Sequence, residues 1–598
     1  MHVAKNHIKI MYGVMIAISS YVQSTPVAPF FSIRSYSQNA ARDLINWRTP
    51  YCPEVCTVHG HFGATFEFIR SFRPNKMARA LFGDALLTTQ DDATIRISGS
   101  RWANRGAQDL LADYFYLPTD YVSTVQIHPK IQTFLVNTYY RLHIDSWVPG
   151  LYVQAHVPLV HTRWDLKLQE KTLNKGVSAQ DPGAFVPDAA LTRNRLLPNA
   201  SAFFNGQEIE NIDDTIFQPL RKAKIADDGK KRTGAGDLYV AIGYDAIQNA
   251  EYGVGFSIEG ILPTSNRPRG EFLWEPMTGN GHHWGFGGSV YGYYTAWNGE
   301  YENSWLSLIA DIHVHHLFTC EQERTFDLKG RPLSRYMLAQ ALGVANTDEA
   351  LQAGTTLSSF QFQREFAPLA NITTLPVDVS IGVQADFVAM AAFNYDHINV
   401  NAGVNVWVRS CEHISLDRVN SLATNVTWAL KGDAQVFGFR ADSTTAIALA
   451  ATQSSATINR GNNFPATGAV TSAQIVAGQK NPGIDTPMPA FQRQDDETFF
   501  ILQYAPSLVG TFNNQISTSG TPIFLSDRDL DIEGAETRAG SCKLFADIHY
   551  NWTEYADSWT PSIGIGGEIE WGFAKQHDSC INTPLSQWGV WVDLRLSY

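Results

Sequence analysis

Strict alternation of apolar and polar residues over long stretches is the strongest pattern in this chain. In residues 397–410, every even position from Ile398 to Val408 is aliphatic, whereas the odd positions are mostly polar. Residues 376–391 and 587–598 alternate in the same way. A period of two that persists over about twelve residues predicts β-strands about twice as long as those of ordinary globular proteins.

Similar alternation, strong or weak, divides the chain into candidate strands. They are residues 57–70, 130–144, 151–168, 237–246, 251–262, 283–298, 304–318, 376–391, 397–410, 541–552, 559–572 and 587–598. The connections between them are alternately long and short, which predicts antiparallel neighbours with all short turns at one end. The sequence therefore predicts an all-β fold: a closed antiparallel up-and-down transmembrane β-barrel of about 12 strands (range about 12–16), with short periplasmic turns and long extracellular loops.

Strand length favours a membrane barrel over a soluble β-sandwich, whose strands also alternate. Trp588 and Tyr598 lie on the same face of one strand, separated by roughly 33 Å along an extended backbone. With a tilt of about 40°, this separation projects to about 25 Å, the height between the aromatic girdles of an outer-membrane barrel. The aliphatic faces of the candidate strands then face lipid.

The end of the sequence carries a resemblance to a known class. Leu594, Leu596 and the final Tyr598 resemble the assembly signal of Gram-negative outer-membrane β-barrels. The resemblance implies an outer-membrane location, with membrane lipid and the barrel-assembly machinery as partners. More weakly, residues 263–266 (Pro-Thr-Ser-Asn) and the glycine-rich stretch 283–297 are similar to fatty-acid and aromatic-hydrocarbon uptake channels, which usually have glycine at the third of those four positions.

The sequence divides into three regions. Residues 1–24 carry two lysines and an apolar stretch at 10–19, and we interpret them as a cleaved signal peptide. Residues 25–56, with a possible short helix at 39–47, form an N-terminal periplasmic segment or a plug. Residues 57–598 form the barrel, with a large extracellular insertion at 411–540 that either folds into the barrel mouth or is a surface loop.

Composition narrows the functional classes. The 598 residues include 45 Lys and Arg against 58 Asp and Glu, a net charge of −13, with 17% charged and 12% aromatic residues. This is too aromatic for a disordered chain. The acidic balance argues against nucleic acid as a partner. The mean hydropathy of −0.17 resembles that of a soluble protein, because each strand averages an apolar and a polar face.

Six cysteines suit an oxidising compartment and allow several disulfide pairings. The economical hypothesis is a local bridge at the inner end and two bridges that staple outer loops. The candidates are Cys52 and Cys56 for the local bridge, and Cys320, Cys411, Cys542 and Cys580 for the loops.

The polar strand faces predict the residues of the barrel lumen. The candidate pore-lining residues are Glu67, Asp311, Asp378, Asp386, Asp547, Glu568, Glu570 and Asp593, the bases Arg141, Arg409, Lys543 and Arg595, and the histidines His313 and His315. The excess of acids predicts a slightly acidic, cation-favouring lumen. The alternative is a narrow lumen packed with salt bridges.

Histidine pairs at i and i+2 share one strand face, at His59 and His61 and at His313 and His315. Such pairs can bind Zn²⁺ or Cu²⁺ when further ligands converge. Nothing in the sequence supplies a complete ligand set, so we interpret them as solvated lumen residues and expect no metal and no cofactor.

These observations predict a porin-like channel that passes small solutes across the outer membrane. The alternative is a non-conducting barrel that acts as a structural or adhesin-like protein through its long loops. A secreted β-rich protein is a third reading, because four Asn-x-Ser/Thr triplets occur. No nucleophile, phosphate-binding or metalloprotease motif is present, so we expect no enzymatic activity.

Overall fold

The computed structural model of the protein describes most of the chain. The described residues are 27–47, 59–83, 93–145, 147–180, 184–186, 191–212, 214–299, 304–343, 361–416, 422, 427–431, 437–440, 446–448, 456–459, 491–492, 498–501, 525–552, 559–573 and 580–598. The predicted signal peptide, residues 1–24, lies outside these ranges, as do Cys52 and Cys56.

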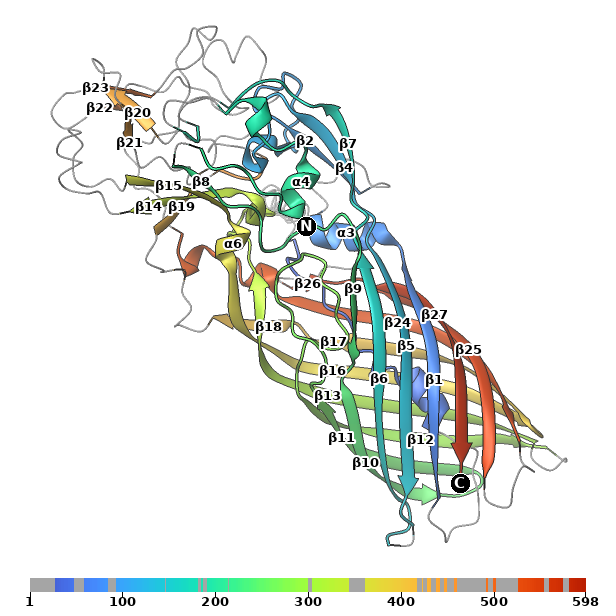
Figure 1. Ribbon diagram of the computed structural model, residues 1–598. Coiled ribbons are helices and arrows are strands. Elements are labelled where there is room, and N and C mark those ends of the chain that lie inside the picture. The colour runs from blue at the N-terminus through green and yellow to red at the C-terminus, as the bar shows by residue number, and fades with distance from the viewer. Residues whose placement is uncertain are drawn as a thin grey trace, which may run out of the picture.

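Twelve antiparallel strands form a closed barrel (Figure 1). They are β1 (His59–Phe72), β5 (Lys130–His143), β6 (Leu151–Asp165), β10 (Leu238–Gln248), β11 (Tyr252–Leu262), β12 (Gly285–Asn298), β13 (Ser304–Thr325), β16 (Thr374–Tyr395), β17 (Ile398–Arg409), β24 (Thr537–Asn551), β25 (Thr560–Gly572) and β27 (Ser586–Ser597). Barrel strands that follow one another along the chain are neighbours in the sheet, including β6 and β10. Pairing of the last strand, β27, with the first, β1, closes the barrel. Each predicted segment overlaps one of these strands, so the up-and-down barrel is confirmed.

The two ends of the barrel differ in their connections. At one end, here the turn end, the connections are residues 144–150, 249–251, 299–303, 396–397 and 552–559. At the other, the loop end, they are residues 73–129, 166–237, 263–284, 326–373, 410–536 and 573–585. In bacterial barrels the short turns face the periplasm. That rule predicts that the loop end faces outward.

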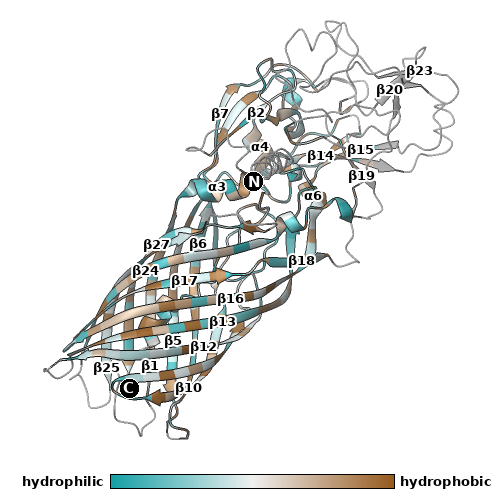
Figure 2. Cartoon of the chain, turned by 180° about the vertical axis from the view of Figure 1, so that it is seen from behind, coloured by the Kyte–Doolittle hydropathy of each residue, from teal (hydrophilic) through white to brown (hydrophobic). Residues whose placement is uncertain are grey.

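The outer surface of the barrel is apolar. Ile242, Ile258 and Ile565 each expose about three-fifths of their surface, whereas Ser257 and Glu259, on either side of Ile258, are buried. Figure 2 shows the resulting alternation of hydrophobic and hydrophilic residues along the barrel strands. Continuous exposure of large aliphatic side chains is unfavourable in water and is matched by lipid. The chain is therefore a transmembrane β-barrel of the outer-membrane type.

Aromatic side chains gather at the turn end. The hydroxyl groups of Tyr140 and Tyr598 are hydrogen-bonded at 2.6 Å, and the ring of Tyr598 lies 5.1 Å from that of Trp559. Such rings are suited to the membrane interface because they join an apolar body to a polar edge. Leu594 points outward on the same strand; the role of Leu594, Leu596 and Tyr598 in barrel assembly stays a prediction.

The connections at the loop end fold into a structure that we call the cap. It contains three four-stranded sheets. The first is made of β2 (Thr94–Ser98), β3 (Leu110–Leu111), β4 (Val122–Gln126) and β7 (Gln169–Asn174), and the second of β8 (Ile216–Phe217), β14 (Leu338–Gly343), β15 (Gln361–Pro368) and β19 (Thr427–Leu430). The third is made of β20 (Phe437–Arg440), β21 (Ala446–Ala448), β22 (Phe491–Gln492) and β23 (Thr498–Ile501). Helices α3 (Pro74–Phe82), α4 (Ala200–Asn205) and α6 (Ala370–Thr373) accompany them. Among the described residues, no helix is long and apolar enough to cross a membrane.

A large apolar core stabilises the cap. Phe115, Phe203 and Phe204 pack with ring centroids 5.0–5.7 Å apart. The 411–540 insertion contributes to this region, because β19 extends the second sheet and the Leu111 N–H donates to the Ile458 carbonyl at 2.8 Å. At least these parts of the insertion are therefore packed against the rest of the cap.

Glu170 ties β7 to the first turn of α4. Its carboxylate accepts hydrogen bonds from the backbone N–H and hydroxyl of Ser201, both at 2.8 Å, and from the Tyr121 hydroxyl. Burial alone would raise the pKa of Glu170, but these hydrogen bonds hold it below its ordinary value. The charged carboxylate therefore stabilises the cap at neutral pH, and this contribution is lost as the pH falls through the lowered pKa.

We expect E170Q to weaken the cap by about 1 kcal/mol at neutral pH. Hydrogen exchange at α4 should be faster than in the wild type at neutral pH, and the difference should shrink as the pH falls through the lowered pKa of Glu170 and the wild-type carboxyl becomes protonated. E208Q, which changes an exposed glutamate nearby, is the control. An effect of E170Q that persists unchanged in acid would contradict the assignment.

Candidate functional site

Residues 27–47, here the N-terminal segment, run from the cap into the barrel. At the loop end, the Ala28 N–H donates to the carbonyl of Ala80 in α3 at 2.8 Å. Farther along, Asn46 donates to Thr65 on β1 at 3.0 Å and accepts from Arg595 on β27 at 3.4 Å. The first barrel strand begins at the turn end and the last one ends there, whereas the segment before them starts at the loop end and passes through the lumen.

The segment contains the short helix that the sequence indicated, α2 (Ala40–Trp47). Its small and aliphatic face packs on an apolar patch of the barrel wall that includes Val388, Phe545 and Trp591. Its other face carries Arg42 and Asn46, which reach polar groups of the wall. A helix with one apolar and one polar face suits a wall of mixed character.

Arg42 forms a buried ion pair with the wall. Its Nη1 lies 2.8 Å from Oε2 of Glu67, and the two side chains expose 1% and 0% of their surface. Its Nη2 donates to the carbonyl of Tyr36 at 2.9 Å. Beside this pair, Lys543 bonds Glu568 at 2.8 Å and Asn39 of the segment at 3.0 Å.

Arg34 forms the second ionic contact between segment and wall. Its guanidinium donates to Asp386 and, at 3.0 Å, to Oδ1 of Asn405. Glu570 lies 4.0 Å away, and the guanidinium carbon lies 5.6 Å from the centre of the Trp407 ring. Both arginines of the segment therefore neutralise carboxylates of the wall.

Hydrogen bonds that involve no arginine or lysine hold the rest of the segment. Ser35 donates to Asp237 at 2.6 Å, and the Tyr36 and Thr133 hydroxyls are 2.7 Å apart. Nε2 of His156 lies 2.6 Å from the Ser37 carbonyl. A cavity of about 40 Å³ separates part of the segment from β24, β25 and β27, which leaves room for only a few water molecules.

Thirteen of the fourteen predicted pore-lining residues are buried inside the barrel. They are Glu67, Arg141, Asp311, His313, His315, Asp386, Arg409, Lys543, Asp547, Glu568, Glu570, Asp593 and Arg595. In this conformation several of them contact the N-terminal segment. That solutes pass along them stays a prediction.

The prediction that Asp378 faces the lumen is wrong. Gly382 and Val383 are both exposed, so the alternation along β16 slips by one residue at this point. Val377, Val379 and Ile381 consequently face inward and are buried, while Asp378 is exposed. The neighbouring strand β13 has two register shifts at the same level. An extra residue of this kind reverses the two faces of every position beyond it.

Glu259 on β11 is a lumen residue that the sequence reasoning missed. It lies 3.0 Å from Nδ1 of His313 and 2.6 Å from Nε2 of His315, and Asp311 lies 3.5 Å from His313. The alternation of residues 251–262 would have placed it inside. In the described part of the chain, no group of three or more His, Cys, Asp and Glu side chains is arranged to hold a metal ion.

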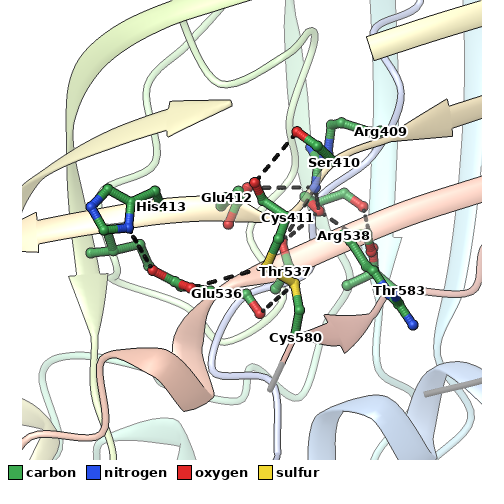
Figure 3. The surroundings of a disulfide bond; sticks show 12 residues. Arg409, Ser410, Cys411, Glu412, His413, Glu536, Thr537, Arg538, Cys580 and Thr583 are labelled. Carbon is green, nitrogen blue, oxygen red and sulfur yellow. Dashed lines mark hydrogen bonds and ion pairs between the residues drawn. A yellow bond between two sulfur atoms is a disulfide. The ribbon is translucent and has the colours of Figure 1, made fainter. Parts of the chain in front are cut away.

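One disulfide lies beside the point where the segment enters the lumen (Figure 3). Cys411, two residues after the end of β17, is bonded to Cys580 in the connection before β27. Thr537 and Thr583, close to this bridge, lie 2.9 and 3.3 Å from the Ser32 hydroxyl of the segment. Arg409 also donates to Ser32.

The expected second staple is absent from the structure. Cys320 and Cys542 are free thiols, and the strands that carry them, β13 and β24, are separated in the barrel by β16 and β17. Neighbouring strands lie about 4.8 Å apart, so the two cysteines are too distant for a bridge. The hypothesis of a Cys52–Cys56 bridge concerns residues outside the described ranges.

No family model and no curated protein matches this chain. Among solved structures, an outer membrane channel from Pseudomonas putida F1 shares 7% identity over 92% of this chain and 100% of that one, with a TM-score of 0.30. The Pseudomonas putida toluene transporter TodX shares 8% identity over 96% of both chains, with a TM-score of 0.26. A Pseudomonas aeruginosa FadL homologue shares 7% identity over 90% of both, with a TM-score of 0.24.

Proposed function

We propose that this protein is an outer-membrane channel for small hydrophilic solutes and that its N-terminal segment holds it closed. The observation that supports the proposal is the character of the contact between segment and wall. The segment is attached through ion pairs and hydrogen bonds, at Arg34, Arg42, Ser35 and Asn46 among others. Water can replace such contacts, so a polar path can open when the segment leaves.

The wall without the segment is acidic. Among the described residues of the twelve barrel strands, the buried carboxylates are Glu67, Asp245, Glu259, Asp311, Asp386, Asp547, Glu568, Glu570 and Asp593, and the buried bases are Arg141, Arg324, Arg409, Lys543 and Arg595. Arg34 and Arg42 of the segment offset part of this excess of negative charge. An open lumen would therefore favour cations over anions.

We expect deletion of residues 27–47 to convert a mostly closed protein into a continuously open, cation-favouring channel. The measurement is single-channel conductance in planar bilayers, with the reversal potential in a salt gradient. Heat-modifiable gel mobility must show that both proteins are folded. A folded deletion variant that passes no current would contradict the proposal.

Two aspartates on β16 provide a matched pair for the selectivity claim. In the deletion variant, D386N should reduce the cation preference because Asp386 faces the lumen. D378N should leave it unchanged because Asp378 is on the exposed face. Equal effects of the two substitutions would show that the preference arises elsewhere.

A second candidate is a non-conducting barrel that acts through its cap. The observation in its favour is that Val27, Phe31 and Ile33 of the segment belong to the same apolar core as the cap. Burial of these side chains opposes release of the segment at the loop end. Closed behaviour of the deletion variant, together with cap-dependent adhesion to cells, would favour this candidate.

A further inference from the structure

The wall around Arg34 is built as a binding site for a planar cation. Asp386 on β16, Asn405 and Trp407 on β17, and Glu570 on β25 surround the guanidinium. All four of these residues are buried, with at most 6% of the surface of each exposed. Two carboxylates, one amide oxygen and one indole ring thus converge from three strands.

Contacts within the wall hold these groups in place without the N-terminal segment. The Asn405 side-chain N–H groups donate to Asp386 and, at 3.0 Å, to the Phe387 carbonyl, which turns Oδ1 of Asn405 towards Arg34. Ser541 and Gln587 donate to the two oxygens of Glu570, Gln587 at 2.8 Å. The site is therefore preorganised by the barrel.

The chemistry of the site favours a guanidinium over other cations. A guanidinium is planar and presents several N–H donors to separate acceptors while its face lies against an aromatic ring. Two other basic side chains of the wall lie near these carboxylates: Lys543 is 3.9 Å from Glu570, and His313 is the cross-strand neighbour of Asp386. Both are shared with other carboxylates, Lys543 with Glu568 and His313 with Glu259 and Asp311, so removal of Arg34 takes away the cation that Asp386 contacts directly.

The wall around Arg42 offers fewer acceptors than the wall around Arg34. There the wall offers a single carboxylate, Glu67, and the second acceptor is a carbonyl of the segment itself. A cavity of about 40 Å³ also adjoins the Arg34 site, and Arg34, Trp407 and Glu570 line it. Water in that cavity can exchange with a ligand that enters beside the segment.

We propose that Arg34 fills a guanidinium-binding site of the barrel wall and that free solutes carrying a guanidinium group, of the arginine class, compete with it for that site. The role in transport rests on the proposed channel function: such solutes displace the segment and are the cations that the lumen passes. Arg34 then acts as an internal substitute for the solute.

Chemical rescue of R34G tests the site. The midpoint temperature of the heat-modifiable gel shift should fall in R34G, and millimolar guanidinium chloride should restore it by several degrees, because a ligand of the folded state stabilises it. These concentrations are far below those that denature proteins. Sodium chloride and urea, the uncharged analogue, should have no such effect. Restoration by either one would overturn the proposal.

R163G is the matched control, because Arg163 is a partly exposed arginine that pairs with Asp165. Guanidinium should raise neither its midpoint nor that of the wild type. A second measurement avoids the variant altogether: in the wild type, arginine amide should accelerate hydrogen exchange at residues 33–38 several-fold, and lysine amide should not. Equal acceleration by the two amides would overturn the proposal.

The results of these experiments distinguish failure of the proposed guanidinium site from failure of the proposed channel function. Rescue of R34G combined with no current through the 27–47 deletion variant would leave the site standing and remove the channel function. Current through the deletion variant combined with no rescue would leave the channel standing and remove the site.

Discussion

Substitution of Arg42 by methionine is expected to reduce the free energy of unfolding by about 3–5 kcal/mol. Arg42 and Glu67 form a buried ion pair at 2.8 Å. The other carboxylate oxygen of Glu67 has no hydrogen-bond partner in the described structure. Methionine fills much of the volume of the arginine side chain but leaves the buried Glu67 carboxylate without its ion-pair partner. The loss of that partner is more damaging than the loss of both charges.

The double variant R42M/E67Q should therefore recover part of this loss. Urea unfolding in lipid vesicles, followed by tryptophan fluorescence, measures all three proteins. R163A is the control, because Arg163 exposes 43% of its side chain and its pair with Asp165 should contribute at most about 1 kcal/mol. If R42M and R163A are equally stable, the Arg42–Glu67 pair does not hold the segment in the lumen.

The barrel could be predicted because lipid and lumen impose opposite preferences on alternate residues. The strands β17 and β27 match the predicted segments 397–410 and 587–598 closely, since each outward position there is aliphatic or aromatic. The same contrast explains why a chain with near-zero mean hydropathy spans a membrane. Such strands can be predicted from local sequence because each residue is apolar or polar according to whether it faces lipid or the lumen.

The N-terminal segment could not be placed in this way. Arg34 meets Asp386, which is 352 positions away, and Asn39 meets Glu568, 529 positions away. The pattern of apolar and polar residues within 27–47 does not indicate which distant residues they contact. The excess of acidic residues on the inner wall could be predicted from the sequence. The two arginines that offset part of it lie in residues 27–47, before the first predicted strand, so the alternation of the strands gives no information about them.

Asp378 and the cysteines show two other limits. The slip at Gly382 and Val383 leaves the aliphatic pattern of residues 376–391 intact while it reverses the faces of Val377 and Val379. Cysteine pairing depends on which strands are neighbours, and the positions of Cys320 and Cys542 along the chain do not show that two strands separate them. The closed order of the barrel supplies that information.

The same order brings Cys411 and Cys580 together, with Cα atoms 6.1 Å apart and 169 positions between them. We expect C411S/C580S to be less stable than the wild type by about 2–4 kcal/mol, because the bridge restricts the unfolded chain over a long loop. Hydrogen exchange near Ser32 should also become faster, since Thr537, Thr583 and Arg409 bond Ser32 beside the bridge. The heat-modifiable gel shift and exchange mass spectrometry measure the two effects.

The free cysteines provide the matched control for the bridge. Reductant should lower the midpoint of the wild type and of C320S/C542S alike, because both retain Cys411 and Cys580. A reductant effect that is lost in C320S/C542S would place the stabilising bridge elsewhere. Faster exchange near Ser32 without a change in the midpoint would mean that the bridge positions the mouth of the lumen more than it stabilises the barrel. Because β24, β25 and β27 are already joined by their own hydrogen bonds, the loosening should be confined to the loop end, where the segment enters.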